Sequence, residues 1–256
     1  MVGWGRISNH ICEVLGNAIF PPACVCCLQD EETLDDTVRL CLKCRAALTP
    51  KLLHVCRRCD APVGPHLDTS FGCIHCRNDR FYFDRVLSLG PYADELRAVC
   101  QRLKNHRQSS LTTAMARLLC ERITAELTEP LDFVLAVPHH WSTRIGQRAE
   151  TSELLAESVS RLLRVSQDRF LIAKTRRTER QSALSPAQRR KNLRKAFRLR
   201  NRERVANRRI LLVDDVLTTG TTANRIAKLL RDAGAQSIIV AVLARGLGDA
   251  RDPTPF

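Results

Sequence analysis

The hydrophobic pattern changes character near residue 81 and from there alternates between two types of segment. Short, nearly continuous apolar runs predict β-strands, and Leu, Val, Ala and Ile recurring every three or four positions predict helices. The predicted strands are 82–89, 131–137, 170–173, 209–213 and 237–244, and the predicted helices are 94–104, 111–126, 151–163 and 222–231. Continuous apolar strands separated by helices indicate a parallel sheet that is covered on both faces.

The composition fits a packed soluble protein with no membrane span. The 256 residues are 44% hydrophobic and 27% charged, enough for one full domain and a smaller module. The longest apolar run, 238–244, is far shorter than the roughly 20 residues of a transmembrane helix. Glu13 and Asn17 interrupt the apolar stretch of the first 20 residues, which therefore does not resemble a signal peptide. We expect a cytoplasmic protein.

Positive charge is concentrated in one region. The formal net charge is +14, yet the segment from Arg161 to Arg209 alone contains 18 basic and 3 acidic residues. The remainder has 23 basic and 24 acidic residues and is nearly neutral. This distribution argues against a histone-like or ribosomal-type protein, whose basic residues would be spread along the chain. It predicts a basic insert over 174–209.

Eight of the 12 cysteines form four C-x-x-C pairs near the N-terminus. The pairs are Cys24/Cys27, Cys41/Cys44, Cys56/Cys59 and Cys73/Cys76. The second set of four repeats the first at an offset of 32 residues, and Asp36-Thr37 recurs as Asp68-Thr69. This repetition indicates a duplicated small module over residues 1–80.

Zinc is the ligand that these pairs favour. Two C-x-x-C turns supply a closed tetrahedral shell of four thiolates, which holds zinc structurally and helps to fold a segment without a large core. Redox or disulfide roles are the alternative, but redox C-x-x-C motifs open a helix in a βαβ unit, whereas these pairs lie among Pro, Gly and Asp turns. The repeat favours two sequential sites, although spacing leaves interleaved pairing open. The remaining cysteines are expected to be small buried residues; they are Cys12, Cys26, Cys100 and Cys120.

The most specific motif is the segment 210–222, Ile-Leu-Leu-Val-Asp-Asp-Val-Leu-Thr-Thr-Gly-Thr-Thr. A hydrophobic strand ends in Asp214 and Asp215, at the edge where open parallel sheets bind ligands. These carboxylates can accept hydrogen bonds from a sugar diol or bind Mg²⁺. The loop that follows offers amide and hydroxyl groups at a helix N-terminus, which suits an anion; its residues are Thr218, Thr219, Gly220, Thr221 and Thr222. Together they predict a site for a ribose 5-phosphate group.

This motif resembles the phosphoribosyl pyrophosphate (PRPP) signature of type I phosphoribosyltransferases. With the cysteine pairs in front of it, nearly the whole chain resembles the ComF family of phosphoribosyltransferase-like proteins. Further stretches that carry the resemblance are Pro21-Pro22-Ala23-Cys24, Leu103-Lys104, Val137-Pro138-His139, Ser152-Glu153-Leu154-Leu155-Ala156, and Arg189-Arg190-Lys191-Asn192 to Ala196-Phe197. The resemblance implies a type I phosphoribosyltransferase-like domain over 81–256, preceded by the cysteine-rich module.

The resemblance also implies a mechanism and a cellular role. Pyrophosphate would leave the anomeric carbon of PRPP while Asp214 and Asp215 hold the ribose hydroxyls, with Mg²⁺ bound beside the diphosphate. Lys104, Arg144 and Arg148 would neutralise the diphosphate. The family is linked to DNA uptake in natural transformation, so that a contact with single-stranded DNA is a further expectation.

One loop departs from the family pattern. The family has Arg-Gly-Phe-Asn-Gln before its Ser-x-Leu-Leu-Ala helix, and here 147–151 reads Gln-Arg-Ala-Glu-Thr. Glu150 would stand near a polyanion, opposing its binding unless Mg²⁺ intervenes. Two hypotheses follow: an active transferase, or a binding protein that keeps the ribose-phosphate site without turnover. No residue identifies the nucleophile.

Three interpretations of the basic insert stay open: a solvated helical face, a lid over the diphosphate, or a nucleic-acid surface. Helical spacing over 186–197 would place Leu193, Ala196 and Phe197 on one side and basic residues around the other. Phe197 is the only aromatic residue in the insert, so base stacking is not favoured. Any DNA contact there would be to the phosphate backbone and sensitive to salt.

Overall fold

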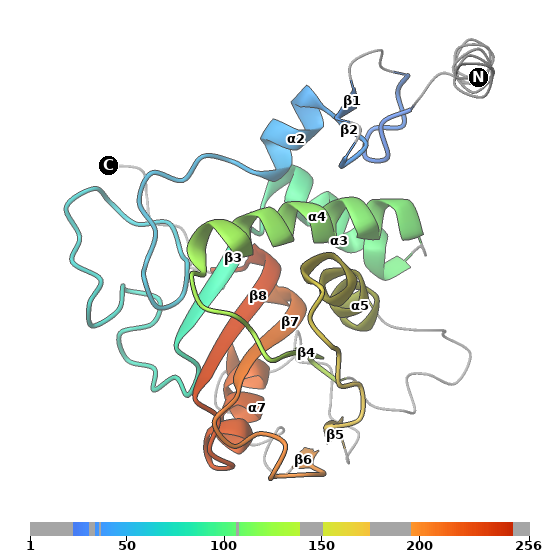
Figure 1. Ribbon diagram of the computed structural model, residues 1–256. Helices are drawn as coiled ribbons and strands as arrows, with labels where there is room; N and C mark the ends of the chain where they lie inside the picture. The colour runs from blue at the N-terminus through green and yellow to red at the C-terminus, as the bar shows by residue number, and fades with distance from the viewer. Residues whose placement is uncertain are drawn as a thin grey trace, which may run out of the picture.

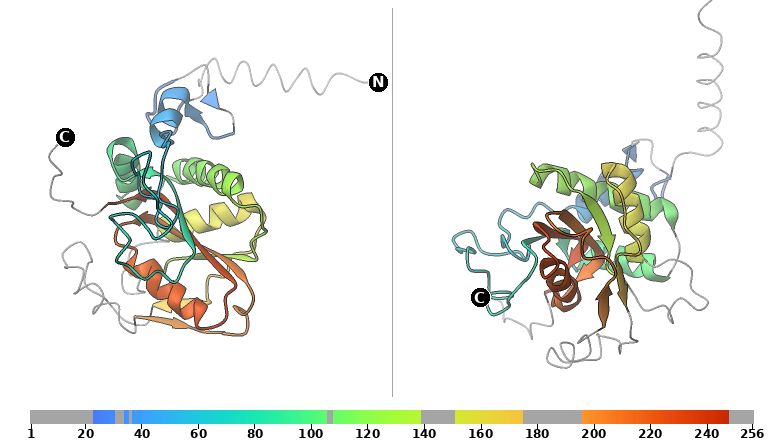
Figure 2. Two further views of the ribbon diagram at one scale, coloured as in Figure 1. Left: turned by 90° about the vertical axis from the view of Figure 1, so that its left-hand side faces the viewer. Right: turned by 60° about the horizontal axis from the view of Figure 1, so that its bottom comes forward.

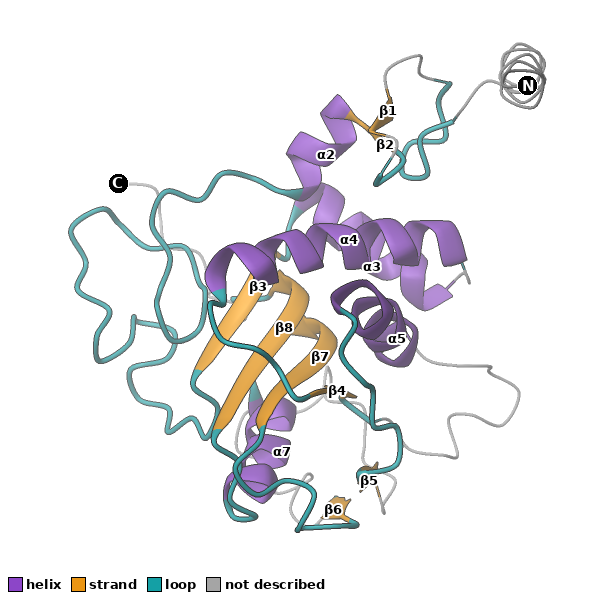
Figure 3. Ribbon diagram, viewed as in Figure 1, coloured by secondary structure: helices purple, strands orange, loops and turns teal. Residues whose placement is uncertain are grey.

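A four-stranded, entirely parallel sheet forms the centre of the computed structural model (Figures 1 and 3). The strand order is β3-β8-β7-β4. The strands are β3 (Arg85–Pro91), β4 (Phe133–Ala136), β7 (Arg209–Leu217) and β8 (Ser237–Arg245). The structure describes residues 23–30, 34–35, 37–105, 108–138, 151–174 and 196–247. The predicted parallel sheet is confirmed.

Both faces of this sheet are buried, which explains the continuous apolar runs. Leu211 and Val213 of β7 point into one hydrophobic core, while Ile210 and Leu212 point into the other. Strand β8 alternates in the same way. Because side chains of a strand alternate between the two faces, a strand covered on both sides needs apolar residues at every position.

The sheet lies between these two cores, and helices cover each of them from outside (Figure 2). Helices α3 (Asp94–Asn105), α4 (Ser109–Glu126) and α5 (Thr151–Leu163) cover one face, and α7 (Thr221–Arg231) covers the other. Helix α4 buries Met115, Leu118 and Leu119 almost completely. Burying a side chain of this size stabilises a fold by about 1.5–3 kcal/mol.

Several boundaries differ from the sequence-based expectation: β3 was expected over 82–89 and β4 over 131–137, and two further differences have a clear structural reason. Strand β7 was expected to end at Val213, but it continues to Leu217 because pairing with β8 extends to Arg245. The expected strand over 170–173 is β5 (Ile172–Lys174), which pairs antiparallel with β6 (Phe197–Leu199).

The expected helix over 186–197 is wrong at its end, since Phe197 begins β6 and is buried together with Ala196 against the α7 side of the sheet. Pairing of Phe197 with Lys174 holds this residue in a strand. The rest of that segment, 186–195, lies outside the described residues.

The first cysteine-rich loop rests on the helices above the sheet (Figure 1). It contains β1 (Leu34–Asp35), β2 (Leu40–Cys41) and α2 (Leu42–Leu48). Arg45 forms an ion pair with Glu121 of α4 at 2.7 Å, and Arg102 of α3 donates to the carbonyl oxygen of Cys26. Leu40 and Leu48 join the same core as α3, α4 and α5.

The second cysteine-rich loop covers the outer edge of β3. The amide of Val86 donates to the carbonyl oxygen of Arg58 at 3.2 Å, and the carboxylate of Asp60 accepts from the amide of Ser88 at 2.6 Å. Asp60 is 4% exposed, and its burial raises the pKa despite the bonds from Ser88 and the charge of Arg122. These contacts satisfy edge groups that would otherwise be open to pairing with another chain.

Among the residues that the structure describes, we find no helix long and apolar enough to cross a membrane.

Candidate functional site

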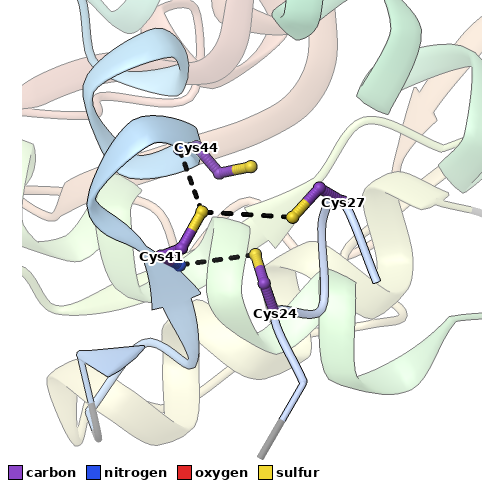
Figure 4. A group of neighbouring side chains, drawn as sticks. All are labelled: Cys24, Cys27, Cys41 and Cys44. Atoms are coloured by element: carbon purple, nitrogen blue, oxygen red, sulfur yellow. Dashed lines mark hydrogen bonds between the residues drawn. The ribbon is translucent and has the colours of Figure 1, made fainter. Parts of the chain in front are cut away.

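The eight paired cysteines form two groups of four, and each group is contiguous in sequence. Cys24, Cys27, Cys41 and Cys44 point their sulfur atoms toward one another (Figure 4), and all four lie within 4.8 Å of each other. The second group has the same property; its members are Cys56, Cys59, Cys73 and Cys76. Of the two pairings that spacing left open, the structure therefore has the sequential one.

Sulfur separations in both groups match a tetrahedral metal shell. Three sulfur–sulfur distances lie between 3.6 and 4.0 Å: Cys27 to Cys41 at 4.0 Å, Cys59 to Cys73 at 3.6 Å and Cys56 to Cys76 at 3.7 Å. Metal–sulfur bonds of about 2.3 Å in a tetrahedron place sulfur atoms about 3.8 Å apart. A disulfide would need about 2.05 Å. Both groups therefore fit zinc.

One thiol in each group ionises readily, and the two occupy equivalent positions of the repeat. Burial opposes ionisation of Cys24, but amides including that of Cys41 lower its pKa to about 7. Burial likewise opposes ionisation of Cys56, while the amides of Cys59 and Arg58 lower its pKa to about 7. A thiolate available near neutral pH gives an incoming cation its first ligand.

The two groups differ in burial and in local structure. All four cysteines of the second group are buried, whereas Cys27 of the first is exposed. Cys41 caps α2, its sulfur accepting the amide of Cys44 at 3.4 Å, so this pair opens a helix instead of lying in a turn as expected. The helix does not belong to a βαβ unit, because it follows the two-residue strand β2, which pairs antiparallel with β1.

Three of the four unpaired cysteines are buried as predicted; they are Cys26, Cys100 and Cys120. Burial raises the pKa of Cys100 to about 12, with a further contribution from the charge of Asp215, and burial does the same for Cys120. These thiols are therefore un-ionised at neutral pH. Cys12 lies outside the described residues.

The acid pair lies at the carboxyl end of β7. Asp215 is 9% exposed, and its carboxylate accepts the amide of Val216 at 2.7 Å. The carboxylate of Asp214 accepts the amide of Asp215 at 2.9 Å. Both carboxylates thus have local backbone partners that fix their orientation.

Lys104 of α3 reaches the same place. Its ammonium nitrogen lies 3.0 Å from an Oδ of Asp215. Burial opposes the charge on Lys104, but the charge and hydrogen bond of Asp215, together with Tyr92 and Asp214, raise its pKa. The lysine expected at the diphosphate therefore contacts the predicted ribose-binding acid directly, although Lys104 and Asp215 are 111 positions apart in the sequence.

The threonine loop joins β7 to α7. Gly220 precedes the helix with φ of 69°, the left-handed region where a side chain is strained even though a Cβ would meet nothing closer than 3.7 Å. The hydroxyl oxygens of Thr219 and Thr221 lie 2.8 Å apart, and the backbone N–H of Asn224 donates to the Gly220 carbonyl oxygen. The loop thus places threonine hydroxyls at the N-terminus of an 11-residue helix, an arrangement suited to phosphate.

A cavity of about 380 Å³ borders this loop. Its lining comes from the threonine loop, from α7, from the second cysteine-rich loop and from the end of β8: His75, Asp79, Phe81, Tyr82, Thr218, Thr219, Thr221, Asn224, Arg225, Lys228, Arg245 and Leu247. Three of the lining side chains are cationic at neutral pH, against one carboxylate, so the cavity suits an anion.

The lining residues outside the threonine loop were not found from the sequence. Arg225 and Lys228 follow Thr221 by four and seven positions, which places all three on one face of α7, and this spacing was a usable signal. His75 and Asp79 carried no such signal, because they belong to the cysteine-rich repeat.

Arg245, at the end of β8, connects the threonine loop to the second cysteine group. It is 3% exposed, and its Nε donates to the carbonyl oxygen of Cys59 at 2.9 Å. Its Nη1 donates to the carbonyl oxygen of Leu217 at 3.0 Å and also to those of Thr218 and Gly246. The sequence alone did not single out this residue.

The other predicted diphosphate contacts lie outside the described residues. They are Arg144 and Arg148, together with most of the divergent 147–151 loop. The described residues resume at Thr151. Its hydroxyl donates to the carbonyl oxygen of Leu103 at 3.1 Å, and the hydroxyl of Ser152 donates to the carbonyl oxygen of Val137. The N-terminus of α5 is therefore held between Lys104's helix and the end of β4.

The fold and these motifs define a protein with a phosphoribosyltransferase-type domain, and residues 113–254 match the phosphoribosyl transferase domain family. The chain is 36% identical to the DNA utilization protein YhgH of Escherichia coli O157:H7 over 217 residues, covering 81% of this chain and 91% of that protein. It is 30% identical to competence protein F of Haemophilus influenzae over 226 residues, covering 80% and 96%. The chain belongs to the ComF family.

Among solved structures, a glutamine PRPP amidotransferase from B. subtilis is 25% identical, with a TM-score of 0.35. The match covers 52% of this chain and 26% of that one.

Proposed function

We propose that this chain binds PRPP, or a related phosphoribosyl compound, with Mg²⁺, in a protein that supports the uptake and handling of DNA. The observation that carries the proposal is the succession of Asp214, Asp215 and the threonine loop at the carboxyl end of β7. Acids for the ribose diol and amide groups for the 5′-phosphate are thereby adjacent. The names of the relatives, DNA utilization protein and competence protein F, support the role with DNA.

Each part of the ligand has a matching group on the chain. Asp214 and Asp215 accept hydrogen bonds from the ribose hydroxyls, and the loop of 218–222 surrounds the 5′-phosphate. Mg²⁺, when bound with the diphosphate, neutralises part of its charge. Lys104 has to exchange part of its contact with Asp215 for the ligand, because its ammonium group contacts that carboxylate at 3.0 Å. Arg144 and Arg148 are the further proposed diphosphate contacts.

We propose zinc for both cysteine groups and a boundary near residue 80 between the cysteine-rich module and the phosphoribosyltransferase-like domain. The sulfur separations of 3.6–4.0 Å support zinc. A cytoplasmic location goes with this proposal, because a reducing compartment keeps such thiols available for metal.

The experiment supplies PRPP and Mg²⁺ with a panel of bases, ammonia and DNA ends, and measures binding by calorimetry and pyrophosphate release. Binding with release that is lost in Asp215→Asn identifies an active transferase. Binding without release identifies a binding protein that keeps the ribose-phosphate site without turnover. Glu129→Gln is the matched control. It removes a carboxylate that pairs with Arg209 at the start of β7, at the opposite end of the sheet, and should leave binding unchanged. Absence of binding by the wild-type chain contradicts the proposal.

A second candidate function is binding of single-stranded DNA through the insert over 174–209. Its described part is basic, but several arginines already have acidic partners: Arg204 pairs with Asp168, Arg208 with Asp132 and Arg209 with Glu129. The segment 175–195 must then supply most of the contacts. Filter binding should show an affinity that falls steeply with salt, by a slope of about −0.7 per phosphate contact. Salt-independent binding, or none, counts against this candidate.

A further inference from the structure

The second cysteine group lies against the proposed ligand site, whereas the first does not. His75 and Asp79, which flank Cys76, line the cavity beside the threonine loop. No described residue of the first cysteine-rich loop is among the lining residues, and that loop contacts α3 and α4 instead. The duplicated module therefore has two copies with different surroundings.

Arg245 is the physical connection between the second group and the threonine loop. Its guanidinium group donates hydrogen bonds to four carbonyl oxygens, which belong to Cys59, Leu217, Thr218 and Gly246. These bonds hold the backbone in place at the point where the threonine loop begins. A shift of Cys59 therefore displaces one of the supports of the loop.

The position of Cys59 depends on closure of its metal shell. Cys56 donates its amide to the carbonyl oxygen of Ala61, and Asp60 donates to that of Cys56, so that the turn around Cys59 is short. Arg58 joins the two turns through hydrogen bonds to the carbonyl oxygens of Phe71 and Asp79, and a bound metal would add a direct link between their four sulfur atoms. A structural metal supplies folding free energy to small modules of this type.

Charge adds to the connection. Arg245 is 3% exposed, and among the described residues it forms no ion pair with a carboxylate. A buried cation is costly unless an opposite charge compensates it. Four thiolates around a divalent ion have a net charge of about −2, and Cys59 contacts Arg245 directly. The second group, when loaded with metal, would supply a compensating negative charge beside Arg245.

We propose that Arg245 is a positioning residue of the phosphoribosyl site, and that ligand affinity depends on metal in the second cysteine group but not in the first. The inference rests on the proposed function. By thermodynamic linkage, the ligand must in turn raise the affinity of the second group for its metal, and we expect this to be seen as slower release of that metal.

The repeat supplies matched variants for the test. Cys44→Ser and Cys76→Ser change equivalent cysteines of the two groups. Arg102→Gln and Arg245→Gln each remove an arginine that donates to a backbone carbonyl of one cysteine-rich loop, at Cys26 and at Cys59. Calorimetry with PRPP and Mg²⁺ measures affinity, and a chromogenic chelator measures the rate at which each zinc equivalent leaves. All variants are first checked for zinc content and cooperative unfolding.

We expect Cys76→Ser and Arg245→Gln to weaken PRPP binding about tenfold or more, and their partners in the first group to change it less than about threefold. Arg245→Lys, which keeps the charge with fewer donors, should fall between. PRPP should slow release of one zinc equivalent of the two. If Cys76→Ser fails to fold, the PRPP affinities of the two Arg245 variants and the rates of zinc release from the wild-type chain test the proposal.

Two failures are distinguishable. Wild-type chain that binds PRPP, with equal affinities in both sets of variants or equal protection of both zinc equivalents, overturns the linkage and leaves the proposed function standing. Wild-type chain that binds no PRPP overturns both.

Discussion

Replacing Lys104 by Met removes the cation that faces Asp215, at nearly constant side-chain volume. The ammonium nitrogen and the carboxylate oxygen are 3.0 Å apart, so that their attraction is about 1.4 kcal/mol in bulk water and about 5.5 kcal/mol at an effective dielectric of 20. Lys104 is half-exposed, which favours the lower part of this range, and ordering its long side chain opposes the gain. Asp215 is left 9% exposed without its cation. We expect Lys104→Met to lower the free energy of unfolding by about 2 kcal/mol.

Urea unfolding at pH 7 with excess zinc measures this loss. Asp215→Asn should cost under about 0.5 kcal/mol, because Asn can still accept the Val216 amide and Lys104 can turn to water. The double variant should resemble Asp215→Asn alone, which gives a coupling energy of about 2 kcal/mol. Lys228→Met, which breaks the exposed pair with Asp232, is the control and should cost at most about 0.5 kcal/mol.

The pH dependence has a definite sign. The folded-state pKa of Lys104 is raised, so its contribution is fully present below its ordinary pKa of 10.5 and is lost as pH rises through the folded value. The difference between wild type and Lys104→Met should be constant from pH 6 to 9 and shrink above pH 10.5. Identical unfolding midpoints for the two proteins at pH 7 refute this description of the acid pair.

Three further predictions concern other parts of the molecule. Gly220→Ala places a side chain at a φ of 69°; calorimetry should show weaker PRPP binding and urea unfolding a loss of about 1–2 kcal/mol, whereas unchanged values would show that the loop tolerates a side chain there. The hydrogen bond from Arg85, with the charge of Arg122, lowers the pKa of Glu126, so its contribution is lost as pH falls below 4.5; Glu126→Gln should be less stable at pH 7 and lose less stability between pH 6 and 3. Elemental analysis should find two zinc equivalents per chain and one after Cys44→Ser, and a chain without zinc contradicts the metal assignment.

The sheet could be predicted because its chemistry is local. Each of its strands contains a run of apolar residues, and burial on both faces favours such a run. The end of β7 could not be predicted in the same way. Asp214 and Asp215 are polar, so the pattern stops at Val213, whereas pairing with β8 keeps the backbone extended to Leu217. The strand end was therefore decided by a neighbour 28 residues away.

The candidate site likewise has a part that local sequence predicts and a part that depends on long-range contacts. The cysteine pairs and the acid–threonine motif are short segments whose residue types and spacing already express their chemistry. The contacts that join them are long-range: Lys104 meets Asp215, and Arg245 meets Cys59 across 186 positions. An arginine at a strand end has no local feature that distinguishes it from a surface arginine, so only the fold reveals its burial and its four carbonyl partners.

The most direct test of the account is a crystal structure of the zinc-loaded chain with PRPP and Mg²⁺. We predict density for the 5′-phosphate within the loop of 218–222 and for the ribose hydroxyls at Asp214 and Asp215, with the ammonium group of Lys104 moved toward the diphosphate. A saturated crystal with an empty loop, or with the ligand bound elsewhere, would contradict the assignment of this loop as a phosphoribosyl site.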